Sequence, residues 1–117
     1  MTLDARLRER YFGDLEGKSG AQEYRTVWEF DARHQIFANV ESPENVYRRA
    51  IAVVKEEQKE NENDLTFIVS HGDTLQILQA GFIGEKDGSE SGVIAAWGHR
   101  NIKHLETGEI RQLNNAG

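Results

Sequence analysis

Hydrophobic positions at helical spacing predict two amphipathic helices in the first half of the chain. The first runs from Ser19 to about Ile36, because Ser19 and Gln22 form a capping box at its start. One stripe of this helix carries Tyr24, Val27, Trp28 and Asp31. A largely aromatic stripe more often packs into a core than it binds a ligand, so we predict that it faces the interior.

The second predicted helix begins at Ser42 and Pro43, since Ser is favoured as an N-cap and Pro at the first helical position. Its apolar residues follow a spacing of i, i+4, i+7 and i+8, and they are Val46, Ala50, Val53 and Val54. This helix therefore buries one side and exposes residues 55–60 to solvent. The polar run 61–64 ends it.

The second half of the chain adds a strand to this helical pattern. Residues 65–69 are almost entirely apolar, as expected of a strand whose two faces are covered by helices. A helix from Asp73 to about Gly81 follows, and we interpret the polar, Gly-rich segment 84–92 as a disordered connection rather than a mobile flap. Residues 101–113 alternate apolar and polar positions and predict an edge hairpin. The predicted fold class is α/β.

Composition narrows the classes of function. At 117 residues the chain has room for a single domain, residues 1–117. A net charge of −6 and a pI near 5.2 argue against a nucleic-acid surface, and no apolar run approaches the roughly 20 residues of a membrane span. Cysteine is absent, which excludes thiolate metal sites and is compatible with a reducing, cytoplasmic location. The four histidines are too scattered to predict a metal site.

The segment Ser70-His71-Gly72-Asp73 carries the most informative local chemistry. It places an imidazole between the predicted strand and the helix after it. The first N–H groups of a helix lack intrahelical partners and lie at its positive end, so they favour an anion. A histidine beside them can donate to a phosphate oxygen. The alternative is structural, with Asp73 as a helix N-cap and His71 packed against the strand end.

Residues 7–17 form a second charged segment with no helical or strand period, which indicates an ordered loop. Glu9 is a candidate proton donor if burial raises its pKa, although the neighbouring arginines act in the opposite direction. Arg10 is a candidate phosphate ligand through its planar fork of donors. The alternative is a solvated charged loop, which is the usual role of such runs.

Together the two segments resemble the histidine phosphatase superfamily, the phosphoglycerate mutase-like proteins. Its members carry a Leu-x-Glu-Arg-x-x-Gly-x-x-x-Gly segment, like residues 7–17, and a later strand ending in Ser-His-Gly, like residues 70–72. Between them lies a Glu-Ser-x-x-x-Val-x-x-Arg stretch, matched by Glu41, Ser42, Val46 and Arg49. Three motifs in this order make the resemblance specific over about residues 7–82.

The resemblance implies a three-layer α/β/α fold and a phosphohistidine intermediate, with no metal or other cofactor. It implies that His71 contacts the transferring phosphoryl group and that Glu9 protonates the leaving oxygen. The implied partner is a small phosphorylated metabolite. Phosphate or substrate binding is predicted for Arg10, Ser70, Gly72 and Asp73.

One family motif is not matched. The nucleophile of the family is a different histidine, in an Arg-His-Gly motif, and no Arg-His-Gly occurs in the 117 residues. We therefore expect this chain to be the C-terminal portion of such an enzyme, with an incomplete layered fold and no turnover by itself. An incomplete sheet leaves the strand 65–69 with an unpaired edge, and such edges recruit other strands. We accordingly expect a homodimer or a strand-swapped assembly that completes the fold.

Three kinds of function remain open at this point, namely a phosphoryl-transfer enzyme, a phosphate-binding module without catalysis and a structural fragment. The favoured one is a phosphatase of small phosphate esters, because only 61 residues, 10–70, separate Glu9 from His71, and the family's mutases carry a longer insertion there. A phosphoglycerate mutase is the alternative within the family. Outside catalysis, the chain is either a phosphate-binding remnant or a structural fragment.

Overall fold

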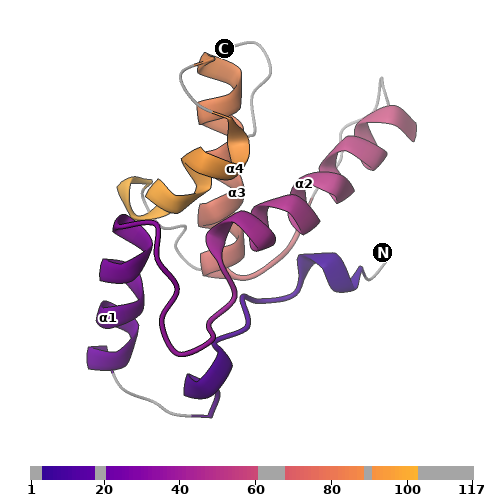
Figure 1. Ribbon diagram of the computed structural model, residues 1–117. Helices are drawn as coiled ribbons and strands as arrows, with labels where there is room; N and C mark the ends of the chain where they lie inside the picture. The colour runs from indigo at the N-terminus through magenta and orange to yellow at the C-terminus, as the bar shows by residue number, and fades with distance from the viewer. Residues whose placement is uncertain (1–3, 18–20, 61–67, 89–90, 103–117) are drawn as a thin grey trace.

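The computed structural model describes residues 4–17, 21–60, 68–88 and 91–102. Four α-helices dominate this part of the chain (Figure 1), namely α1 (Ala21–Ala32), α2 (Pro43–Glu60), α3 (Gly72–Asp87) and α4 (Gly92–Ala95). Short 3₁₀ helices supplement them at η1 (Ala5–Leu7), η2 (Gly13–Leu15) and η3 (Ala96–Asn101). Helix α3 packs against α2, α4 and η3, so it is the centre of the arrangement.

The α/β prediction is wrong for the part of the chain that the structure describes, because these residues form helices and no strand. Of the predicted strand 65–69, only Ile68 and Val69 are described, and both have irregular backbone. A strand is stable only when a neighbouring strand accepts and donates its backbone hydrogen bonds, and the described residues supply no such neighbour. Ile68 instead packs against the main core, whereas Val69 is 73% exposed.

The predicted helices are confirmed in existence, with shifted ends. Helix α2 starts at Pro43 as predicted, and the Ser42 hydroxyl accepts a hydrogen bond from the Asn45 N–H at 3.0 Å. Helix α1 ends at Ala32, before Ile36, because His34 adopts a positive φ of 57°. The capping residue Ser19 and the hairpin predicted after residue 102 lie outside the described residues.

The described residues of the polar segment 84–92, which are 84–88 and 91–92, are more ordered than the sequence suggested. Helix α3 continues through Gly84 to Asp87 and ends at Gly88, which has the left-handed conformation that commonly terminates helices. Gly92 then begins α4. At its other end α3 has His71, not Asp73, as its N-cap, so the structural alternative for Asp73 is also wrong.

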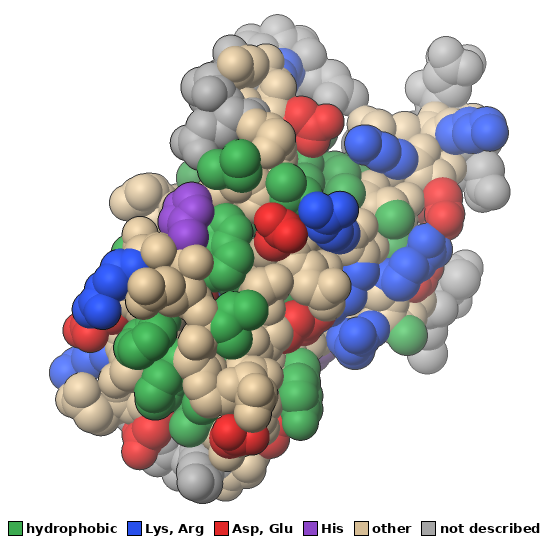
Figure 2. All heavy atoms as spheres, viewed as in Figure 1, with side chains coloured by type: hydrophobic (Ala, Val, Ile, Leu, Met, Phe, Trp, Pro, Cys, Tyr) green, Lys and Arg blue, Asp and Glu red, His purple; other side chains and the backbone are tan. Residues whose placement is uncertain are grey.

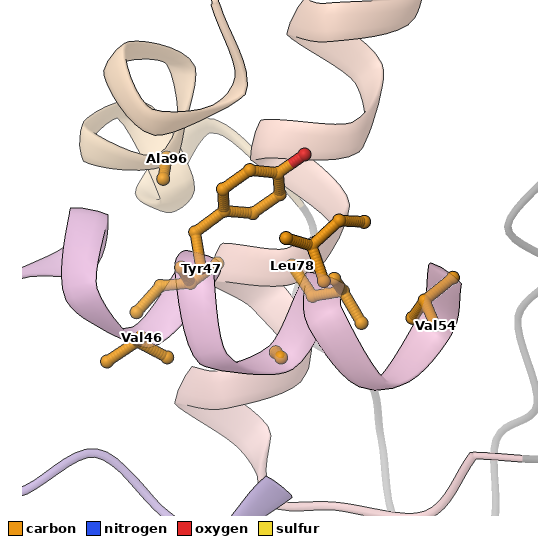
Figure 3. Packing of buried hydrophobic residues seen from close by; sticks show 8 residues of the cluster. Val46, Tyr47, Val54, Leu78 and Ala96 are labelled. Carbon is orange, nitrogen blue, oxygen red and sulfur yellow. The ribbon is translucent and has the colours of Figure 1, made fainter. Parts of the chain in front are cut away.

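The main hydrophobic core lies between α2 and α3 (Figure 3). Val46, Ala50 and Val54 come from the stripe predicted on α2, and each is at most 5% exposed. Ile77 and Leu78 of α3 pack against them. Ala96 of η3 closes the cluster on the side that Figure 3 shows above Tyr47, whose hydroxyl donates to Glu85 at 2.6 Å.

A second, smaller cluster holds α1 against the loops on either side of it. Leu15, Val27 and Val40 form its buried centre, and half-buried aromatic residues pack around it. The stripe predicted on α1 is therefore only partly core. Val27 and Asp31 are buried, whereas Tyr24 and Trp28 are half-buried and line a pocket described below.

Charges of both signs and scattered hydrophobic side chains share the face seen in Figure 2, with Lys and Arg gathered over the region of α2. In the described part of the chain, no helix is both long and apolar enough to cross a membrane. The homodimer was expected from an unpaired strand edge, and it stays a prediction because the described residues contain no such strand.

The tight contact between α3 and α4 generates the first prediction. A Cβ atom at Gly81 would lie 2.3 Å from Tyr47 Cε1 and 2.8 Å from the Gly92 carbonyl oxygen, so Gly81→Ala forces α3 away from its neighbours. We expect a loss of about 1–3 kcal/mol in the free energy of unfolding, measured by urea denaturation. Gly98→Ala is the matched control, because the nearest atom there is 3.6 Å away. Equal stability of the two variants would contradict the packing described.

Candidate active site

The acid-bearing loop, residues 4–12, is fixed to α2 by the guanidinium of Arg49. This group donates to the carbonyl oxygens of Arg6 and Arg8, both at 2.8 Å, and to that of Glu9 at 3.2 Å. It also forms a bidentate pair with the Glu41 carboxylate, at 2.9 Å for both bonds. All five N–H groups of Arg49 therefore have acceptors, and three of these acceptors are backbone atoms of the loop.

Glu41 secures the same loop from the other side. Its Oε1 accepts a hydrogen bond from the Tyr11 N–H at 3.0 Å, and its own N–H donates to the Tyr11 carbonyl at 2.8 Å. The Glu41 carbonyl accepts from Arg10 Nε, also at 2.8 Å. Of the four matched residues of the middle motif, Glu41 and Arg49 therefore hold the loop, whereas Ser42 caps α2 and Val46 is buried in the core.

The start of α3 meets this loop across a long stretch of sequence. The Ser70 hydroxyl donates to the Leu7 carbonyl, 63 residues earlier in the chain. The Thr74 hydroxyl lies 2.9 Å from the Arg8 carbonyl and 3.3 Å from Glu9 Oε1. The sequence segments that carry His71 and Glu9 are therefore joined by direct hydrogen bonds between residues flanking them.

Glu9 is half-buried, and its carboxylate is oriented by two groups. Oε1 accepts a hydrogen bond from the Arg10 N–H at 2.9 Å and lies near the Thr74 hydroxyl. That hydroxyl has one proton, which the shorter contact to the Arg8 carbonyl takes. Its oxygen can accept a hydrogen bond from the O–H of a Glu9 carboxylic acid at the same contact.

Arg10 is the buried anchor of the loop, with 2% of its surface exposed. Its two terminal nitrogens form a bidentate pair with Asp31 of α1, at 2.8 Å for each bond. Asp31 Oδ2 also lies 3.0 Å from Nε2 of the fully buried His99 in η3. Asp31 thus ties together three segments that are distant in sequence.

Asp31 and Glu41, the carboxylates that pair with Arg10 and Arg49, have lowered pKa values, which favours their ionised forms. Burial alone raises the pKa of Asp31, but hydrogen bonds from Arg10 and His99 outweigh it, so that the pKa lies below its ordinary value of 3.8. Burial likewise raises the pKa of Glu41. Hydrogen bonds from Arg49, the Tyr11 backbone and Asn45 bring it below 4.5.

A pocket of about 650 Å³ opens between the loop, α1 and α3. Its polar lining contains two of the predicted site residues of the loop, Glu9 and Arg10, and one from α3, Asp73. Arg8, which is exposed, adds a cation at the rim. The rest of the lining is Tyr11, Phe12, Glu16, Tyr24 and Trp28.

The predicted site residues separate into two groups. Glu9, Arg10 and Asp73 meet in the pocket, whereas His71 is exposed at the N-cap of α3 and does not line it. Ser70 and Gly72 flank His71 at the start of the helix. The described residues contain no group of three or more metal-ligating side chains.

Sequence reasoning missed the residues that hold Arg10 and the acid-bearing loop in place. Asp31 was predicted only as part of a core stripe, and His99 and Thr74 were not singled out. A carboxylate on an otherwise apolar helix stripe was the available signal, because such a group is buried only with a partner of opposite charge.

The saturated guanidinium of Arg49 gives the second prediction. Arg49→Lys keeps the charge but offers three donors in place of a five-donor fork, so the loop loses about 2 kcal/mol of local stability. Limited trypsin digestion, followed by mass spectrometry, then shows roughly thirtyfold faster cleavage at Arg6 and Arg8. The control is Arg48→Lys, because Arg48 is 62% exposed and, among the described residues, pairs with Glu44 alone, at 3.4 Å. Equal cleavage in both variants would argue against Arg49 as the anchor.

The lowered pKa values of Asp31 and Glu41 give the third prediction. A depressed native pKa stabilises the fold above the ordinary values of 3.8 and 4.5, and this contribution is lost as the pH falls through the native values. The free energy of unfolding should therefore decline below about pH 4.5. Carboxyl ¹³C shifts of the folded protein measure both pKa values directly, and a midpoint above the ordinary value for either residue would refute the assignment.

Comparison with known proteins agrees with the motifs assembled here. The family model of the histidine phosphatase superfamily (branch 1) matches residues 1–106. Neither the curated proteins nor the solved structures contain a match to the chain. The family match extends over most of the 117 residues and includes the acid-bearing loop, the Glu41–Arg49 motif and the start of α3. The chain therefore belongs to the histidine phosphatase superfamily, a family of phosphoryl-transfer enzymes.

Proposed function

We propose that this chain forms the acid-bearing side of a metal-independent site for the hydrolysis of small phosphate esters. The observation that carries the proposal is the set of hydrogen bonds from Ser70 and Thr74 to the loop around Glu9. These bonds hold a candidate proton donor beside a helix N-terminus that begins with a histidine. Cleavage of an ester P–O bond uses both groups, because the proton donor protonates the leaving oxygen and the helix N-terminus with its histidine stabilises the phosphoryl charge.

Glu9 is assigned the proton transfer to the leaving oxygen. It lines the pocket, and the Thr74 hydroxyl and the Arg10 N–H orient its carboxyl group. In the acid form it donates its proton as the P–O bond breaks, so that the alcohol leaves neutral. This role explains why a carboxyl with a fixed orientation stands in a pocket rather than on the open surface.

The start of α3 is assigned the phosphoryl group. The backbone N–H groups of Gly72 and Asp73 lie at the positive end of a 16-residue helix, and His71 is the exposed N-cap beside them. Arg8 contributes an exposed charge at the rim of the pocket, whereas three of the five N–H groups of Arg10 are taken by Asp31 and the Glu41 carbonyl. Arg10 therefore acts on the substrate mainly by fixing the loop.

Turnover needs one more group. In the reaction implied by the family, a histidine nitrogen attacks phosphorus, the ester P–O bond breaks, and water later cleaves the phosphohistidine. The nucleophile lies in an Arg-His-Gly motif, which these 117 residues do not contain. We accordingly expect the chain by itself to bind phosphate without hydrolysing its esters.

A titration of inorganic phosphate, followed by ³¹P chemical shift, tests the binding site. We expect saturable binding that weakens about tenfold in His71→Ala, because one charge-assisted hydrogen bond is worth roughly 1.5 kcal/mol. His34→Ala is the matched control, since His34 is exposed but stacks on Trp97, away from the pocket. Absence of binding, or an equal effect of both substitutions, would overturn the proposed phosphate site.

Hydrolysis of phenyl phosphate by the purified chain tests the role of the missing motif. We expect no release of phenol above the buffer rate. Turnover that disappears in His71→Ala would show that the chain carries a working nucleophile of its own, and the division of roles proposed here would be wrong.

A further inference from the structure

We propose that the leaving group of the substrate is an uncharged aromatic alcohol, so that the preferred esters are aryl phosphates without a second anionic group. This inference rests on the proposed function and specifies its substrate class. It follows from two properties of the pocket beside Glu9, which are the aromatic character of one wall and the sign of the charges around it.

The wall formed by α1 and residues 11–12 of the loop is built from aromatic rings. Tyr11, Phe12, Tyr24 and Trp28 all line the pocket. Phe12 meets Tyr24 edge to face at 5.0 Å between ring centres, and Tyr24 stacks near Trp28 at 6.4 Å. A planar, apolar leaving group gains favourable ring contacts on such a wall, whereas an aliphatic polyol gains less and loses its hydration.

Three of these rings, those of Phe12, Tyr24 and Trp28, are held in place before any ligand arrives. The Arg100 guanidinium lies 3.7 Å from the ring centre of Trp28, and it is itself tethered to Gln76 of α3 at 3.2 Å. Arg10, fixed by Asp31, lies 5.7 Å from the Phe12 ring centre. Rings that are already ordered lose little conformational entropy when a ligand stacks on them, which favours binding.

The charges of the pocket exclude a second anionic group. Besides Glu9, which acts in its acid form, two carboxylates line the pocket, those of Glu16 and Asp73. Two arginines line the pocket, and Arg10 is already paired with the buried Asp31. Arg8 has no such carboxylate partner among the described residues, so it is the cation of the lining that can offset this negative charge. One phosphoryl group is accommodated at the start of α3, but a carboxylate or second phosphate on the leaving group would face this excess of negative charge. A phosphoglycerate-type substrate is therefore disfavoured.

Two phosphonates that cannot be hydrolysed test the inference by ³¹P titration of the whole chain. Phenylphosphonate carries the ring and methylphosphonate does not, and each carries a single phosphonate group. We expect phenylphosphonate to bind about tenfold more tightly. In a Trp97→Phe background, where Trp28 is the remaining tryptophan, phenylphosphonate should also change the fluorescence of Trp28 with the same midpoint.

A pair of substitutions on α1 localises the effect. Tyr24→Leu removes a ring from the pocket and should reduce the preference for phenylphosphonate to about twofold or less. Phe30→Leu is the matched control on the same helix, because Phe30 stacks on Phe37 at 4.9 Å and is not part of the pocket lining. This control should keep the tenfold preference, and circular dichroism confirms that both variants are folded.

The outcomes separate this inference from the function on which it rests. Equal binding of the two phosphonates would overturn the aromatic leaving group while leaving a phosphate site in place. Tighter binding of 3-phosphoglycerate than of phenylphosphonate would overturn it as well. If neither phosphonate nor inorganic phosphate binds, the proposed function and this inference both fail.

Discussion

The five hydrogen bonds of the Arg49 guanidinium are the interaction on which the candidate site depends. The loop that carries Glu9 has little regular structure of its own, and its carbonyl groups need donors. Arg49 supplies donors to three of them from a rigid helix whose apolar side is buried in the main core. The fixed geometry of this irregular segment therefore derives from the packing of α2, and it holds the Glu9 carboxyl in one orientation.

A second group of polar contacts connects the acid-bearing loop, α1 and η3. Asp31, buried on α1, accepts hydrogen bonds from Arg10 and is also hydrogen-bonded to His99 in η3. Burying these groups is costly, and mutual pairing offsets the cost only when the geometry is well matched. The bidentate pair meets this condition. Such an arrangement contributes more to fixing one register of loop, helix and 3₁₀ segment than to net stability.

How well a feature could be predicted from the sequence depends on how far apart in the chain its interacting residues lie. Local signals were sufficient for α2, because the Ser42 cap and the apolar stripe both lie within the helix. They also singled out Glu9 and the start of α3 as candidate site components, and the structure places the two in contact through Thr74. The strand at 65–69 was predicted from apolarity alone, although a strand needs a partner that local sequence does not reveal. Asp31 and His99 were missed for the same reason, since their structural role depends on a hydrogen bond between residues that are 68 positions apart in the sequence.

The two hydrophobic clusters lie on opposite sides of the pocket. Tyr24 and Trp28 belong to the unit around α1, whereas Asp73 belongs to the unit around α3. Among the described residues, the two clusters share no buried apolar residue. Contacts that connect the two units are polar or stacked, namely those of Asp31 with Arg10 and His99, and of Arg100 with Trp28. The relative position of the units, and with it the width of the pocket between them, therefore depends on ion pairing and ring contacts as well as on apolar burial.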